Sequence, residues 1–162
     1  MVEVTVDRIL LNPIADYRVV ILKEIGAERY LPIYIGRFEA DAIAIRLQGH
    51  EHHRPLTHDL LNHVIAELGG EVSHILVNDM RNDTFYARIF VNVNGQQLNI
   101  DSRPSDAIAL AVRCDAPIFV EEEVMKTGIT PEPDISENAD GEELDAFREF
   151  VDSLDLDDLP IQ

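Results

Sequence analysis

The chain has 162 residues, a length that fits one domain with a sizeable core and an appended segment and argues against two full domains. Its 13 Lys and Arg residues face 31 Asp and Glu residues, and the formal net charge of −18 excludes a broad basic surface for nucleic acid. With no apolar run of about 18 residues, no signal-peptide pattern and only one cysteine, Cys114, we expect a soluble, cytoplasmic protein without a membrane partner or an internal disulfide.

The beginning of the chain predicts three strands and a helix. Alternating apolar and polar positions indicate strands over residues 2–11, 17–25 and 29–35, with a turn at residues 12–16. Gly36 opens the helix and Gly49 ends it. Its apolar positions, at helical spacing, are Phe38, Ala42, Ala44 and Ile45.

A second helix is predicted after a polar, histidine-rich connection at residues 48–56. Thr57 is a suitable N-cap, and Asp59 lies in the first turn, where the helix macrodipole favours a carboxylate. The connection lacks the His-Glu-x-x-His order of metalloproteases, so an ordinary polar loop is favoured over a weak metal site. The predicted apolar side of the helix comprises Leu60, Leu61, Val64, Ile65 and Leu68.

Further along, three more strands and a third helix are predicted. The strands cover residues 71–79, 84–93 and 96–100, and Asn94-Gly95 indicates a two-residue hairpin turn between the last two. Pro104 suits the first turn of a helix that runs to about Cys114, and residues 117–120 resume an extended segment.

One strand-helix unit is used twice. Asp41-Ala42-Ile43-Ala44-Ile45 is nearly repeated 65 positions later as Asp106-Ala107-Ile108-Ala109-Leu110, and Ile35 aligns with Ile100. Together the elements predict an α+β fold with a mainly antiparallel, mixed sheet and packed helices.

The end of the chain differs in composition. Residues 121–162 carry 2 Lys and Arg against 15 Asp and Glu, a net −13, whereas residues 1–120 carry a net −5. We expect a domain over residues 1–125, a flexible acidic linker over 126–141 and an acidic tail over 142–162. Leu144, Phe147, Val151 and Leu154 are spaced as in a short amphipathic helix of that tail.

Two clusters of polar residues are candidates for chemistry. Asp101, Arg103, Ser105 and Asp106 surround the predicted strand-to-helix junction, where Ser105 and Asp106 also suit simple helix capping but Asp101 and Arg103 do not. The second cluster, Arg54-Pro55-Leu56-Thr57-His58-Asp59, has a similar order of groups. Solvated helix starts are the alternative explanation of both.

No phosphate-binding glycine loop, nucleophile elbow or Cys-x-x-Cys pair is present, which leaves acid, base and metal chemistry. Phosphodiester hydrolysis needs carboxylates for Mg²⁺ or Mn²⁺, a cation for the phosphorane and a base for water. Arg54 and Arg103 would supply the cation and His58 the base, and Ser105 is a further catalytic candidate. The candidate metal ligands are Glu39, Asp59, Asp101 and Asp106.

At these residues the chain resembles the bifunctional nuclease family, whose members are described as both DNases and RNases. The resemblance covers about residues 1–125, and the tail resembles C-terminal extensions of some members at residues 147–152. It implies a compact α+β domain that often self-associates, here as a dimer or larger homo-oligomer, with DNA or RNA as substrate. The matching stretches are 31–36, Glu39-Ala40, 42–44, 54–60, 84–87, 101–110 and 116–118.

Two alternatives stay open. In the first, the protein is a noncatalytic binding or regulatory module, in which arginines 54 and 103 pair internally with carboxylates and the acidic tail binds a protein partner. In the second, the tail mimics nucleic acid and occupies the binding surface of its own domain. Truncation after about Met125 would then raise nucleic-acid affinity at low salt, because it removes long-range repulsion.

Overall fold

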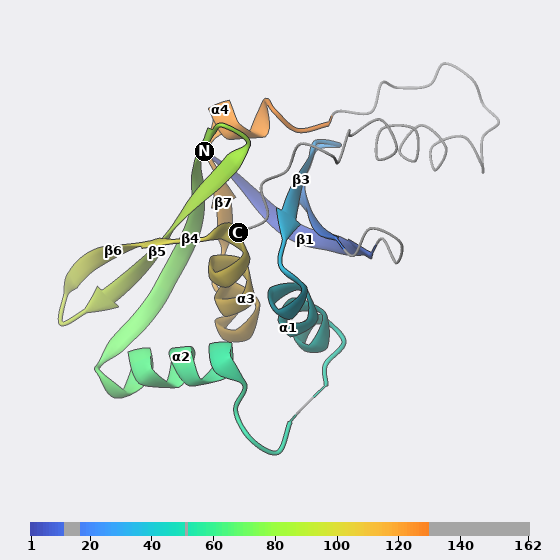
Figure 1. Ribbon diagram of the computed structural model, residues 1–162. Helices are drawn as coiled ribbons and strands as arrows, with labels where there is room; N and C mark the ends of the chain where they lie inside the picture. The colour runs from blue at the N-terminus through green and yellow to red at the C-terminus, as the bar shows by residue number, and fades with distance from the viewer. Residues whose placement is uncertain (12–16, 51, 130–162) are drawn as a thin grey trace, which may run out of the picture. The chain divides into compact units, whose positions relative to one another are not determined.

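The computed structural model describes residues 1–11, 17–50 and 52–129, which fall within one compact unit, Met1–Pro131. Over these residues seven strands form one sheet, accompanied by four helices (Figure 1). The elements are β1 (Val2–Leu11), β2 (Arg18–Glu24), β3 (Tyr30–Ile35), α1 (Arg37–Leu47), α2 (Thr57–Glu67), β4 (Gly70–Arg81), β5 (Thr84–Val93), β6 (Gln96–Ser102), α3 (Pro104–Cys114), β7 (Ile118–Val120) and α4 (Glu122–Met125).

The strand order of the sheet is β3-β2-β1-β7-β4-β5-β6. All neighbouring pairs are antiparallel except β4 and β7, which are parallel. The prediction of an α+β fold with a mainly antiparallel, mixed sheet is confirmed.

The two halves of the sheet repeat one plan. β1, β2 and β3 form an antiparallel meander that leads into α1, and β4, β5 and β6 form another that leads into α3. Asp41 of α1 and Asp106 of α3 are the aspartates that align in the two copies. The strand-helix unit is therefore used twice, as the sequence predicted.

Helix α3 is the centre of the helical layer. It packs against α1, α2, β4 and β5, and α1 also packs against β2. In Figure 1, α1 and α3 lie side by side, and the chain enters α2 close to both. Residues 107–111 of α3 are almost completely buried. This stretch consists of alanines and branched apolar residues, which let the neighbouring elements pack closely against the helix. This packing brings the N-terminal ends of three helices together.

Local signals placed several boundaries correctly. Asn94 and Gly95 both have positive φ, 50° and 80°, as a two-residue hairpin turn between twisted strands requires. Pro104 is the first residue of α3, Cys114 is the last, and Gly36 is the N-cap of α1.

The predicted N-cap of α2 was wrong by one residue. Leu56 is the N-cap and Thr57 begins the helix. The Asp59 carboxylate accepts a hydrogen bond from the Leu56 backbone N–H at 2.8 Å, so a side chain inside the first turn satisfies the backbone donor of the N-cap residue itself.

The predicted apolar sides of α1 and α2 were wrong in part. Phe38 is 81% exposed, whereas the predicted Ala42 is buried; α1 also buries Ala40 and Ile43, which were not predicted. In α2 the only buried residue is His58. The exposed apolar residues are Leu60, Leu61 and Val64 of that helix and Leu68, its C-cap. Periodicity locates an apolar stripe, but whether a neighbour covers it depends on tertiary packing.

The predicted turn at residues 12–16 lies outside the described residues, as do most of the predicted linker and the tail helix. Within the part of the chain that the structure describes, none of the helices has the length and apolar character needed to span a membrane.

Candidate functional site

A pocket of about 580 Å³ lies where α1 meets the N-terminal ends of α2 and α3. Its lining contains four of the candidates from the sequence, Glu39, His58, Arg103 and Asp106. The other lining residues are Phe38, Asp41, Ala42, Ile45, Pro55, Leu56 and Thr57. We call this the acidic pocket, because Glu39, Asp41 and Asp106 outnumber Arg103 in it.

Arg103 joins two carboxylates of the acidic pocket. Its Nε donates to Oδ2 of Asp106 at 2.7 Å, and its Nη2 donates to Oε1 of Glu39 at 2.7 Å. The arginine side chain is 65% exposed, whereas that of Glu39 is only 16% exposed. These two carboxylates raise the pKa of Arg103, so the guanidinium is a permanent positive charge at the mouth of the pocket.

His58 contacts the other oxygen of Asp106. Nε2 of His58 lies 3.1 Å from Oδ1 of Asp106, and the imidazole is nearly buried. Burial by itself raises the pKa of the Asp106 carboxyl, but hydrogen bonds from Arg103 and His58 outweigh burial and hold that pKa below its ordinary value. Asp106 is therefore an anion that orients both an imidazole and a guanidinium.

The N-terminus of α3 explains why these groups converge. Pro104 occupies the first helical position, where a missing backbone N–H costs nothing, and Asp106 follows in the first turn at the positive end of the helix dipole. Ser105 is buried and is not part of the pocket lining.

Asp59 does not line the acidic pocket. One oxygen accepts from the Leu56 backbone, and the other accepts from Nε of Arg113 at 2.6 Å. Burial raises the pKa of the Asp59 carboxyl, and these two hydrogen bonds lower it further than burial raises it. Arg113, whose side chain is 4% exposed, also donates from Nη1 to Ala109 O at 2.6 Å and from Nη2 to Ala42 O at 3.0 Å.

The arrangement identifies Asp59 and Arg113 as a structural pair that ties α2 to α3 and α1. Sequence analysis did not single out Arg113. The signal was available, because a lone arginine in the apolar run of α3 must find partners inside the fold.

Two other candidates lie away from the acidic pocket. Asp101 is an exposed residue of the edge strand β6, paired in register with Arg88 of β5. Arg54 is exposed in the connection before α2. Neither residue lines the pocket.

In the described part of the chain the acidic pocket has no assembled set of metal ligands. Among residues 1–11, 17–50 and 52–129, no three His, Cys, Asp or Glu side chains are grouped closely enough to hold one. Glu39 and Asp106 each give an oxygen to Arg103 instead. The described arrangement is an ion-pair network and does not fit an assembled metal centre.

Fold and pocket together define a small α+β domain that presents an imidazole, a guanidinium and carboxylates in one depression. The model of the bifunctional nuclease domain matches residues 20–132. The chain belongs to the bifunctional nuclease domain family, which confirms the resemblance found in the sequence.

Individual relatives differ in how much of the chain they cover. Uncharacterized protein Rv1829 of Mycobacterium tuberculosis is 39% identical over 163 residues, 98% of each chain. Bifunctional nuclease 1 of Oryza sativa subsp. indica is 26% identical over 114 residues, 68% of this chain and 34% of the relative. Bifunctional nuclease 2 of Oryza sativa subsp. japonica is 30% identical over 105 residues, 63% of this chain and 32% of the relative. The chain thus spans about a third of the length of these plant proteins.

Proposed function

We propose that this protein hydrolyses phosphodiester bonds in DNA and RNA at the acidic pocket. The observation that carries the proposal is the chain of contacts from His58 through Asp106 to Arg103 and Glu39, in a depression open to solvent. The family and the printed names of the plant relatives support the reaction class.

Each group has a role that its contacts suggest. In the tautomer that donates Nε2–H to Asp106, His58 keeps a lone pair on Nδ1 and can accept a proton from the attacking water. Water is the nucleophile common to both substrates, since DNA has no 2′-hydroxyl. Arg103 stabilises the charge that develops on the phosphoryl oxygens, and Asp106 positions both groups.

Phe38 supports a single-stranded substrate. An aromatic ring that is 81% exposed on the pocket lining can stack on an unpaired base, and such stacking is worth about 1–3 kcal/mol per base. A base inside a duplex has no free face to offer.

The cofactor part of the proposal is one Mg²⁺ or Mn²⁺ ion. It would supply positive charge that the pocket lacks, since three carboxylates there face one guanidinium. Glu39 and Asp106 are the two carboxylates nearest to Arg103, and the arginine would have to release them for an ion to bind. Roles for Arg54, Asp59, Asp101 and Ser105 remain predictions from the sequence.

The test measures cleavage of fluorescent single-stranded RNA and DNA by the full chain, with Mg²⁺, with Mn²⁺ and with EDTA. We expect cleavage by the wild type and a loss of about 100-fold or more in His58→Gln. Activity must co-purify with the protein, because otherwise it belongs to a contaminating nuclease, and equal activity in His58→Gln preparations would overturn the proposal. Equal cleavage in EDTA would remove the metal ion from it.

A noncatalytic module is the second candidate, and the pairing of Arg103 with two carboxylates favours it, because such a guanidinium already has its charge compensated. This candidate predicts binding of nucleic acid or a protein partner without cleavage in any metal.

Self-association belongs to the same proposal. The exposed apolar residues of α2 are of the kind that a second copy of the chain covers in a homo-oligomer. Light scattering during size-exclusion chromatography should give at least a dimer, and Val64→Glu should reduce it to a monomer. If truncation after Met125 exposes more apolar surface, measured by dye binding, the acidic tail covers this face instead. A cytoplasmic location also belongs to the proposal, and the presence of a single cysteine, Cys114, supports it.

A further inference from the structure

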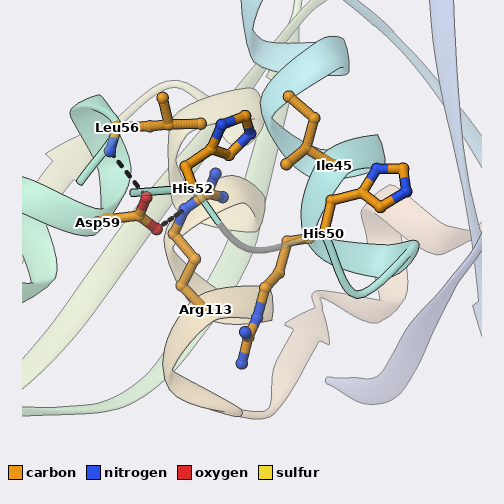
Figure 2. Close-up of a pocket in the computed structure, with 7 residues that line it drawn as sticks. Ile45, His50, His52, Leu56, Asp59 and Arg113 are labelled. Atoms are coloured by element: carbon orange, nitrogen blue, oxygen red, sulfur yellow. Dashed lines mark hydrogen bonds and ion pairs between the residues drawn. The ribbon is translucent and has the colours of Figure 1, made fainter. Parts of the chain in front are cut away.

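A second pocket, of about 220 Å³, continues from the acidic pocket. The two pockets share Ile45 and Leu56 as walls, so they are neighbours along one surface. Figure 2 shows this second pocket between the end of α1, the connection before α2, and α3. Its lining is Ile45, Arg46, His50, His52, Leu56, Asp59 and Arg113. We call it the basic pocket, because two arginines and two histidines line it together with a single carboxylate.

The carboxylate of the basic pocket, Asp59, already has hydrogen-bond partners within the fold. Both Asp59 oxygens accept hydrogen bonds, from Leu56 and from Arg113 (Figure 2). All three Arg113 nitrogens donate to partners within the fold. This pair is neutral as a whole and contributes no free charge.

Arg46 and two histidines remain as donors. Nε of Arg46 donates to Val112 O at 3.1 Å, which positions the guanidinium, and within the described part of the chain its Nη1 and Nη2 have no hydrogen-bond partner. Within the described residues, the exposed rings of His50 and His52 also have no hydrogen-bond partner. Glu51, between them, lies outside the described residues.

The position of His50 is set by the end of α1. His50 N donates to Ile45 O at 3.1 Å and Gly49 N to Arg46 O at 3.0 Å, the two bonds of a Schellman motif, with Gly49 at φ 70°. The histidine therefore follows directly from the helix that also carries Arg46.

From these contacts we propose that the basic pocket is a phosphate-binding subsite for single-stranded nucleic acid, and this inference rests on the proposed function of the acidic pocket. The strand lies across both pockets, with one phosphate at the acidic pocket and a flanking phosphate bound by Arg46, His50 and His52. Guanidinium and imidazole donors suit phosphate oxygens, and among the described residues that line this pocket the single carboxylate, Asp59, already has both oxygens hydrogen-bonded.

The subsite resolves an electrostatic difficulty. A pocket with three carboxylates repels a polyanion, and the chain as a whole carries −18. A local basic site beside it holds the strand by charges that do not take part in the reaction. Because it neutralises only one or two phosphates, it predicts a shallow salt dependence, with log K falling against log salt by about 0.7 for each phosphate.

The test compares two arginines of α1 in the full chain. Arg46→Gln removes the charge of the subsite, and Arg37→Gln removes an equal charge from an exposed residue of the same helix that lines neither pocket. The ion pair of Arg37 with Asp41 of the acidic pocket is 3.8 Å long and exposed, so it contributes little energy. The probe is a fluorescein-labelled oligodeoxythymidylate of about 12 nucleotides, followed by anisotropy in a salt titration without added metal.

We expect Arg46→Gln to weaken binding about tenfold and to reduce the salt slope by about 0.7, with wild-type behaviour in Arg37→Gln. A His50→Gln exchange should weaken binding in the same direction. In cleavage assays the loss in Arg46→Gln should fall on KM for the 12-mer and disappear for a dinucleotide, which is too short to reach the subsite.

The outcomes separate the two proposals. Binding that depends on Arg46, in a chain that cleaves nothing, would keep the subsite and overturn the nuclease. Cleavage with the same KM and the same salt slope in Arg46→Gln and Arg37→Gln would keep the nuclease and overturn the subsite. Circular dichroism of each variant verifies that the fold is intact.

Discussion

Nε2 of His58 and Oδ1 of Asp106 lie 3.1 Å apart, although 48 positions separate the two residues in the chain. The contact joins the start of α2 to the start of α3. It turns two separate helix N-termini, each of which would be unremarkable alone, into one chemical unit with an oriented imidazole.

The first prediction compares two aspartates. Asp106→Asn removes the anion that orients His58 and Arg103, and kcat for single-stranded RNA should fall about 100-fold to 10,000-fold. Asp101→Asn makes the same exchange at an exposed residue outside the pocket, and its kcat should stay near wild type. A comparable loss in Asp101→Asn would instead favour the metal-ligand role that the sequence suggested for it.

The second prediction concerns Arg113. Arg113→Met keeps most of the side-chain volume, but it leaves Asp59 without its partner and removes the hydrogen bonds from the guanidinium to Ala109 O and Ala42 O. We expect the free energy of unfolding to fall by about 3 kcal/mol, measured in urea. Arg113→Lys retains the positive charge but lacks the three donor nitrogens of the guanidinium, so the free energy of unfolding should fall by part of that amount. A change below ~0.5 kcal/mol in both variants would contradict the structural role.

The third prediction uses Gly36, the N-cap of α1. A Cβ atom there would lie 2.2 Å from Oε2 of Glu39, and the backbone at φ −66° accepts alanine without strain. Gly36→Ala should therefore displace the Glu39 carboxylate from Arg103 and lower activity to the level of Glu39→Gln.

The double variant Gly36→Ala with Glu39→Gln provides the control. Because both changes act on one carboxylate, the losses should not add. Additive losses would mean that Gly36→Ala acts elsewhere, and a fall of more than ~1 kcal/mol in the free energy of unfolding would point to the helix cap.

The fourth prediction is a pH dependence of stability. The pKa of Asp59 is below its ordinary value of 3.8 in the folded state, so its pair with Arg113 stabilises the fold fully above that value and less as pH falls through the lower, folded-state pKa. The difference in unfolding free energy between wild type and Asp59→Asn should be constant from about pH 7 to 5 and shrink below about pH 4. In an Arg113→Met background this pH dependence should be much weaker.

Much of the fold was predictable because its signals are local. The Asn94-Gly95 turn, Pro104 at the start of α3 and the repeated Asp-Ala-Ile-Ala segment each depend on neighbouring residues alone. The exposure of Phe38 and of the apolar side of α2 was not predictable in this way, because it depends on which element packs over a helix face.

The sequence predicted several residues that line the candidate site, but it did not predict which of them pair with each other. Glu39, His58, Arg103 and Asp106 were named as candidates and line one pocket. The sequence could not separate Asp59 from Asp106, since both are first-turn aspartates. What distinguishes them is the arginine each one meets, the buried Arg113 or the exposed Arg103, and that is a property of how α3 packs.

The three residues of β7 have a consequence for the order of assembly. This strand pairs with β1 on one side and with β4 on the other, and the two meanders have no other strand pairing with each other in the described residues. During synthesis, each half of the sheet can therefore be made in full before any backbone pairing between strands joins it to the other. The continuous sheet forms only after Val120 has left the ribosome, so in a nascent chain stopped before Ile118 the two half-sheets would be held together mainly by the packing of α1 against α3.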